Sequence, residues 1–311
     1  RSPPISSSNF CTARVSAGLT YEGDLTTTYG VKWGPLVEAR HDYSKVTELD
    51  AADTEGHFTR DLGTVGLNIS YPLVKRYEKV TAIVEPVAQF AVSPRKQVSP
   101  FQPNEDSLSV EFDETTLFAF NKSPGFDIYE GGSRLNLGFR TRLNFASGLK
   151  VEGLIGRTLR DKAETQFLKT VDDNAGNPIL DGNGIPYTYD PSGLGRKTSD
   201  WIINANFDTQ KGLYGYTRLR LDSETSKISQ GEYGLSVQRP NTVATVRYIF
   251  NDILLTPKVE NGKLKVFGDN YRNAQIYGRH FFTANWGVAA RLDRDLVKDI
   301  LATADSNGAG M

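Results

Sequence analysis

The chain has 311 residues, a formal net charge of -1, 38% hydrophobic residues and 29 glycines. The near-zero net charge excludes an electrostatic attraction to nucleic acid. No run reaches the roughly 18 apolar residues of a membrane helix, although a membrane strand needs only every second residue to be apolar. Because Cys11 is the single cysteine, an intramolecular disulfide and a cysteine-based metal site are also excluded.

Apolar and polar residues alternate with a period of two along most of the chain, which predicts strands. In the stretch LNLGFRTRLNF, Leu135, Leu137 and Phe139 share one face, while Arg140 and Arg142 share the other. Many of these segments exceed the roughly 9–11 residues that a tilted strand needs to cross a bilayer. About twelve strands are predicted, near residues 12–22, 27–44, 58–74, 78–93, 131–146, 148–160, 198–210, 212–224, 228–239, 242–254, 268–282 and 284–296.

Short and long connections alternate between these predicted strands. The long connections fall at 45–57, 94–130, 161–197 and 251–267, and one of medium length lies around Ser226. Barrels of the outer-membrane type have short periplasmic turns and longer outer loops. The sequence therefore predicts an all-β fold, part of an antiparallel transmembrane β-barrel; an extended soluble antiparallel protein is the alternative.

The predicted organisation has three parts: a disordered or unpaired start at 1–11, a partial barrel at 12–296, and a flexible or non-native tail at 297–311. A weaker pattern at 292–302 is compatible with an amphipathic helix. Pro35 and Pro86 lie inside strand patterns, where a proline removes a ladder donor, so they are expected at bulges, edges or strand ends.

An acidic, phenylalanine-rich segment, PNEDSLSVEFDETTLFAFNKSPGFDIYEGG, fills 103–132. An EF-hand is disfavoured because the segment lacks the central glycine. Glu111 and Asp113 would share a strand face, but nothing near them supports paired-carboxylate hydrolysis. The apolar residues disfavour disorder. We therefore expect an ordered long loop that folds over or into the barrel mouth; its carboxylates meet divalent cations or, more simply, are solvated surface charge.

The remaining residues offer no catalytic or cofactor-binding constellation. His41, His57 and His280 are scattered without metal-ligand spacing. The glycine-containing stretches match no phosphate-binding loop. We expect no enzyme activity, no cofactor and no metal site.

The acidic segment and the strands beside it resemble the LPS-assembly protein LptD family of Gram-negative bacteria, most closely its alphaproteobacterial branch. The likeness begins at Tyr71-Pro72-Leu73 and Glu85-Pro86 and is diffuse over residues 14–295. Its specific block comprises Asn104, Glu105, Asp106, Ser107, Glu111, Phe112, Asp113, Leu117, Phe118, Asn121, Gly125, Asp127, Glu130, Gly131 and Gly132.

The resemblance implies an outer-membrane barrel of about 26 strands that inserts lipopolysaccharide (LPS) into the outer leaflet. In that plan an LptE-like lipoprotein plugs the lumen, an LptA-type bridge delivers LPS through a periplasmic jelly-roll domain, and lipid A leaves sideways through a seam. The jelly-roll and about half the strands are expected to lie outside this chain, so we expect the fragment not to insert alone. A passive porin or a soluble β-rich binding module are the alternative functions.

Arginines on the polar faces raise one further hypothesis. If these faces line a lumen, the arginines lie near the path of the LPS phosphates; ordinary lumen lining is the alternative. The residues concerned are Arg134, Arg140, Arg142, Arg218 and Arg220.

Overall fold

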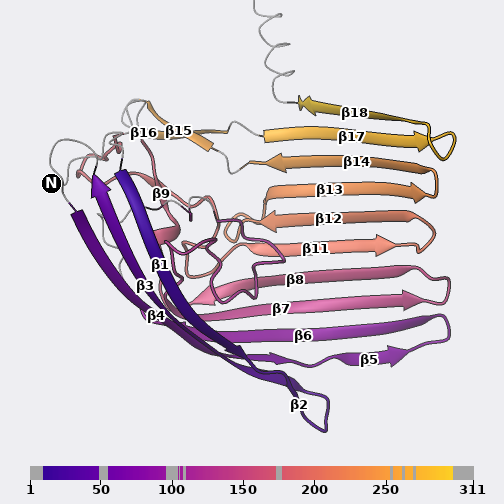
Figure 1. The fold of residues 1–311 in the computed structure, drawn as a ribbon, viewed down its shortest axis with the longest axis horizontal. Helices are drawn as coiled ribbons and strands as arrows, with labels where there is room; N and C mark the ends of the chain where they lie inside the picture. The colour runs from indigo at the N-terminus through magenta and orange to yellow at the C-terminus, as the bar shows by residue number, and fades with distance from the viewer. Residues whose placement is uncertain are drawn as a thin grey trace, which may run out of the picture.

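A computed structural model describes residues 10–48, 55–95, 104, 106–107, 110–172, 177–252, 255–260, 263–268 and 271–296. Twelve long strands form an antiparallel meander in which each pairs with the next long strand along the chain (Figure 1). They are β1 (Phe10–Glu22), β3 (Lys32–Glu48), β4 (Glu55–Ser70), β6 (Val80–Ser93), β7 (Gly132–Phe145), β8 (Lys150–Arg160), β11 (Trp201–Asp208), β12 (Leu213–Leu221), β13 (Ile228–Arg239), β14 (Thr242–Asn251), β17 (Tyr271–Phe281) and β18 (Gly287–Asp295).

Short elements complete the fold. β2 (Leu25–Thr26) and β5 (Leu73–Arg76) add to the main sheet beside β3 and β6. Two small hairpins and one 3-10 helix lie in the long connections, namely β9 (Lys169–Thr170) with β10 (Thr188–Tyr189), β15 (Leu255–Glu260) with β16 (Lys263–Gly268), and η1 (Thr165–Phe167). In the described residues, no helix has the length and hydropathy needed to span a membrane.

All twelve predicted strands are confirmed in type and order, with small shifts of their bounds. Figure 1 shows the short turns at one end of the sheet and the long connections at the other; we call these the short-turn end and the long-loop end. β1, β3 and β4 turn steeply away from the remaining strands, so the sheet curls rather than lying flat. β1 and β18 are the two ends of the strand order in the described residues.

Three sequence expectations need correction. The predicted long connection at 45–57 is wrong because β3 continues to Glu48 and β4 starts at Glu55; the intervening 49–54 lie outside the described residues. Phe10 and Cys11, expected in an unpaired start, pair with Glu48 and Thr47 in β1. The helix suggested at 292–302 is wrong for residues 292–295, which are strand, because pairing with β17 overrides a weak local preference. Residue 296 is helical, and 297–302 and the tail lie outside the described residues.

The two faces of the sheet reverse the burial of a water-soluble protein. Consecutive residues of β4 illustrate this, since Thr64 is 1% exposed and its neighbour Val65 is 56% exposed. Polar side chains such as Asn136 and Thr158 are fully buried, whereas Val15 and Val246 are exposed. Soluble proteins rarely expose contiguous apolar surface of this kind. We call the polar side the inner face and the apolar side the outer face.

Both strand prolines lie where the neighbouring strand is interrupted. β1 pairs with β3 as far as Glu22 opposite Leu36, and β2 resumes the pairing beyond Pro35. β4 likewise ends at Ser70 and β5 resumes beyond Pro86. Each proline carbonyl accepts a hydrogen bond from the interrupted side, and in an antiparallel ladder the missing N–H points the same way. The expectation of a bulge or strand end is confirmed.

Candidate functional site

The acidic segment between β6 and β7 lies across the inner face of the sheet, and we call its described residues, 104, 106–107 and 110–131, the strap. At one side Arg14 of β1 contacts Asp106 at 2.5 Å. At the other side Arg218 of β12 contacts Glu114, with Nε 2.7 Å from Oε1. Six long strands separate β1 from β12 in the sheet order. The strap therefore bridges strands that do not touch one another.

Two aspartates join the strap to β1. The Asp106 carboxylate accepts the backbone N–H groups of Phe126 and Asp127 at 3.0 and 2.9 Å, which ties the two limbs of the strap together. Arg14 then contacts Asp106 and Asp127 with separate guanidinium nitrogens, each at 2.5 Å. Burial alone would raise the pKa of Asp106, but these N–H donors and Arg14 outweigh it and hold the pKa well below its usual range.

Cation–π contacts and hydrogen bonds extend this attachment to β3 and β4. Arg14 and Arg40 both lie over the Phe126 ring, with their guanidinium carbons 5.0 and 4.9 Å from the ring centre. Arg60 donates to the Phe126 carbonyl. Asp42 is buried on β3 and contacts both Arg40 and Arg60, at 3.1 and 2.9 Å. Three arginines and three aspartates thus balance one another at this side of the strap.

The backbone conformation requires a glycine at one position of the family-like block, Gly125. Its φ of +70° lies in the left-handed region that glycine tolerates without strain. A Cβ at this position would also overlap the Asp106 carboxylate. Any other residue would therefore disturb both the turn and the aspartate that ties the strap limbs together.

The end of the strap carries a buried charge cluster centred on Glu130. Its Oε1 lies 2.5 Å from Arg160 and 3.4 Å from Lys122, and its Oε2 lies 3.7 Å from Arg134. All four side chains are at most 1% exposed. Arg134 also donates to Ser93 and to the Phe120 carbonyl. One carboxylate therefore faces three cations from the strap, β7 and β8.

Charge and burial act in opposite directions on the pKa values of this cluster. Burial alone would raise the pKa of Glu130, but Lys122, Arg160 and Arg134 together lower it to about 2. Burial lowers the pKa of Lys122 to about 8, despite the favourable charge of Glu130. The carboxylate is thus ionised at neutral pH and its electrostatic attraction fixes the strap against the sheet.

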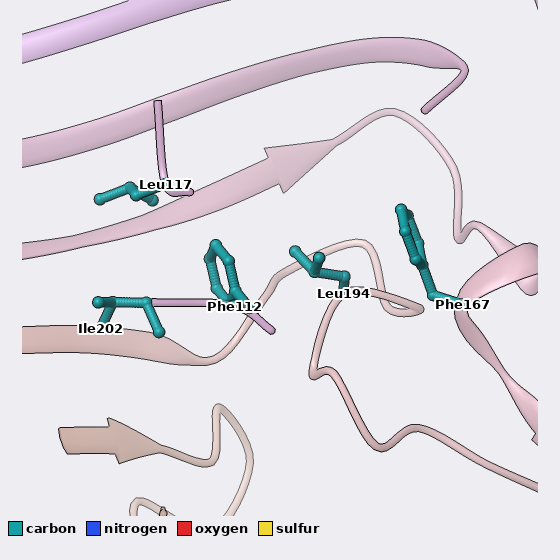
Figure 2. Close-up of a cluster of buried hydrophobic side chains, with 5 residues drawn as sticks. All are labelled: Phe112, Leu117, Phe167, Leu194 and Ile202. Atoms are coloured by element: carbon teal, nitrogen blue, oxygen red, sulfur yellow. The ribbon is translucent and has the colours of Figure 1, made fainter. Parts of the chain in front are cut away.

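A small hydrophobic core forms between the sheet, the strap and the connection between β8 and β11. Figure 2 shows Phe112 and Leu117 of the strap with Leu194 and Phe167 of residues 161–200 and Ile202 of β11. Leu154 of β8 and Phe118 of the strap pack against this cluster. The two long connections are therefore held together on the inner face by apolar contact.

Two glycines make a notch for the strap. Gly138 of β7 and Gly156 of β8 lie directly opposite each other in register. A Cβ at Gly138 would lie 2.7 Å from the Phe118 ring, and one at Gly156 would lie 2.5 Å from Leu117. Contacts this short are not tolerated without movement. The glycine pair lets Leu117 and Phe118 reach the sheet backbone.

The remaining residues of the family-like block shape the strap itself. Asn104 accepts the Ser107 N–H at 3.0 Å, and Asn121 accepts the Glu130 N–H at 3.1 Å. The Asp113 side chain accepts the N–H of Thr115 in a local turn. Glu111 is exposed, and Gly131 and Gly132 pack against Arg95. These contacts are structural and assign no ligand to the block.

The five predicted arginines lie on the inner face but in two different settings. Arg134 and Arg220 are buried beneath the long connections; Arg220 donates to the carbonyls of Ser192 and Pro191. Arg140, Arg142 and Arg218 are about half exposed and pair with Glu85, Glu152 and Glu114. Only these three remain accessible, and contact with LPS stays a prediction.

Sequence reasoning did not identify the partners of the strap. Arg14, Arg40, Arg60 and Arg160 hold it, but each looks like an ordinary polar residue of an alternating strand. In the sequence, these arginines are marked only by their position on the polar face of a predicted strand. Within the described ranges no group of three or more His, Cys, Asp or Glu is arranged to hold a metal ion.

We predict that Gly138→Val displaces the strap, because the new side chain would occupy the space of Phe118. Overpacking of this kind costs about 1–3 kcal/mol. The measurement is the rate of protease cleavage within residues 104–131 of the folded protein, which should rise. Gly278→Val is the matched control, since a Cβ at Gly278 has nothing within 4 Å; equal cleavage of the two variants would contradict the notch.

We also predict that acid releases the strap through Glu130. Its folded pKa of about 2 lies below the ordinary value of 4.5, so its contribution to stability is full above about pH 4.5 and is lost as pH falls toward 2. Cleavage of the strap measured from pH 7 to pH 3 should accelerate in the parent protein.

The difference between the parent and Glu130→Gln isolates this group from other titrating residues. Glu130→Gln should already be loose at pH 7, because removing one partner of a buried ion cluster costs about 3–5 kcal/mol. Glu152→Gln removes an exposed partner of Arg142 and should cost less than about 1 kcal/mol. A Glu130→Gln protein as resistant as Glu152→Gln would refute the role of the cluster.

Comparison with known proteins agrees with this architecture. Among models of protein families, the one described as LptD, LPS transport system D, matches residues 7–286. A search of curated proteins finds no match. The matched residues include the strap and nearly all of the twelve-strand sheet. The chain therefore belongs to the LptD family of LPS transport proteins.

Proposed function

We propose that this chain forms part of the wall of an integral outer-membrane barrel that inserts LPS into the outer leaflet, without covalent chemistry. Membership of the LptD family provides the role in LPS transport at the outer membrane. The single observation that carries the placement in a membrane is the reversed burial of the sheet, apolar outside and polar inside. A soluble binding module would not leave so much apolar surface in water.

Aromatic side chains at the short-turn end support the same placement. Trp33, Tyr77, Phe282 and Trp286 are all exposed and lie in or beside the short turns. Membrane barrels carry aromatic girdles where the apolar band meets water. In our proposal this rim lies at the periplasmic surface, and the long connections face outward.

The accessible arginines of the inner face form a polar surface for LPS headgroups. Arg140, Arg142 and Arg218 keep about half of their side-chain area exposed although each has a carboxylate partner. Arginine suits phosphate recognition because its planar guanidinium donates several hydrogen bonds and is weakly hydrated. We propose that LPS phosphates and acidic sugars pass along this surface.

The strap is a fixed part of the wall in this account and not a free loop. Its ion pairs and apolar core hold it over the inner face from β1 to β12. A wide passive porin needs an open lumen. The strap and the connection between β8 and β11 would narrow that lumen. The occupied inner face therefore favours guided transport over passive diffusion.

The partners follow from the family and are part of the proposal. An LptE-like lipoprotein would occupy the lumen beside the strap, and an LptA-type bridge would deliver LPS through a periplasmic jelly-roll domain. Co-purification of the full-length protein with a small lipoprotein would support the first of these partners.

The proposal predicts that reversing charge on the inner face slows LPS delivery. Arg140→Glu with Arg142→Glu places new carboxylates beside Glu85 and Glu152, and like charges repel an anionic substrate. We expect at least a tenfold drop in newly exported LPS, about 1.4 kcal/mol. The measurement is surface LPS in cells that depend on the full-length variant.

Lys79→Glu with Lys211→Glu is the control, because it makes the same charge change in two short turns. Heat-modifiable migration verifies that each variant has assembled as a barrel. Unchanged export by the inner-face variant would leave these arginines as ordinary lumen lining. Export lost equally in both variants would mean that net charge alone is responsible.

A further inference from the structure

The outer face carries an arginine near the long-loop end, Arg157 of β8. It lies opposite Leu137 in the register of β7, and Leu137 is exposed on the outer face. Its neighbours Gly156 and Thr158 point the other way, toward Leu117 of the strap and toward Asn136. Arg157 therefore projects among apolar side chains.

The Arg157 guanidinium is held in place without being neutralised. Its Nη2 donates to the Ser199 carbonyl at 2.8 Å, and its Cζ lies 4.5 Å from the centre of the Trp201 ring. Its Nε is buried and has no hydrogen-bond partner. No carboxylate of the described residues lies within ion-pair distance of it, in contrast to Arg142 and Arg218.

The acidic residue between Ser199 and Trp201 is committed elsewhere. Asp200 contacts Nε of Arg220 at 3.4 Å and accepts the backbone N–H of Ser223 at 3.1 Å. Arg220 lies near the end of β12 and Ser223 just after it. The partly exposed guanidinium of Arg157 is thus oriented by its neighbours without a carboxylate partner among the described residues.

Arg157 lies near the long-loop end of the outer face. It is three residues from the end of β8 at Arg160, about 10 Å along a strand that rises about 3.3 Å per residue. Further from that end, Ile155 and Phe139 are exposed and apolar. Arginine facing lipid costs about 2–4 kcal/mol at the midplane but about 0–1 near the interface. Tryptophan is enriched at the same depth.

We propose that Arg157 and Trp201 form a binding site for a phosphate group of lipid A on the outer, membrane-facing surface of the barrel. The phosphate accepts from Nη1 of the guanidinium, which makes no hydrogen bond within the described residues, and the acyl chains lie against Leu137, Phe139 and Ile155. This site rests on the proposed function for the leaflet that faces the long-loop end. It is separate from the inner-face arginines and would hold LPS outside the lumen.

The test uses the full-length protein, purified with its natural partner in detergent and stripped of lipid. Native mass spectrometry then measures binding of phosphorylated lipid A and of dephosphorylated lipid A. We expect Arg157→Gln to weaken binding of the phosphorylated form at least tenfold, while binding of the dephosphorylated form stays weak and unchanged. Arg157→Lys should retain part of the affinity, because it keeps the charge but not the stacked, forked geometry.

Arg279→Gln is the control for loss of an arginine that lies over an aromatic ring elsewhere, since Arg279 lies 5.2 Å from the centre of the Phe281 ring, near the short-turn end and on the inner face. It should bind phosphorylated lipid A like the parent. Equal binding by Arg157→Gln and the parent would overturn the site, as would equal binding of the two lipid A forms. Competition by phosphatidylglycerol at the same concentration would overturn the choice of lipid A.

The two proposals fail in different ways. If the parent protein is not recovered from the outer membrane, the proposed function fails. If the parent protein inserts and exports LPS but Arg157→Gln binds phosphorylated lipid A normally, only the outer-face site is refuted. Heat-modifiable migration of Arg157→Gln confirms that a loss of binding does not reflect misfolding.

Discussion

The ionised carboxylate of Glu130 and its three cations fix the arrangement on which the inner face depends. A buried charge is costly unless it is paired. The pairing here draws on Lys122 of the strap, Arg134 of β7 and Arg160 of β8. The end of the strap therefore has one favourable position relative to two adjacent strands, and the contacts farther along the strap follow from that position.

A polar interior takes the place of a large hydrophobic core in this sheet. The buried cluster around Phe112 and Leu117 is small, and it lies between the long connections and the strands. Most of the apolar side chains of the strands face outward instead. Ion pairs and hydrogen bonds on the inner face consequently decide how the long connections are placed. The apolar outer face can be stable in this form only where its environment is lipid.

β8 contributes side chains both to the inner face under the strap and to the outer face. Gly156 and Thr158 of β8 face inward, toward Leu117 and Asn136, while Arg157 between them faces outward onto Trp201. Strand alternation therefore places a buried polar network and a cation of the outer face on consecutive residues. A substitution on β8 can affect either surface, depending only on the parity of its position.

The strands could be predicted because alternation is a local property of the sequence. Antiparallel pairing in a meander followed from the short turns, and even Pro35 and Pro86 lay at the expected interruptions. The bounds were less accurate, since β3 and β4 extend farther than their patterns suggested. The extra residues of β3 and β4 are mostly polar and pair with each other, and such pairing leaves no signal in the sequence of either strand alone.

The site could be predicted only in part. The acidic segment was identified as an ordered loop from its phenylalanines, but its partners were not. Arg14 and Asp127 are 113 residues apart, and Asn204 and Glu114 are 90 apart. Such contacts depend on the curl of the sheet, which no local pattern encodes. The two settings of the arginines, buried for Arg134 and open for Arg142, are likewise decided by where the strap lies.

Cysteine cross-linking across the strap tests its placement on the inner face most directly. In a Cys11→Ser background, Glu114→Cys is combined with Arg218→Cys, or with Thr217→Cys as the control on the opposite face of the same strand. We predict that a short thiol-reactive linker joins 114 to 218 and not to 217, since Glu114 and Arg218 contact each other at 2.7 Å. Cross-linking to 217, or to neither position, would contradict the placement of the strap.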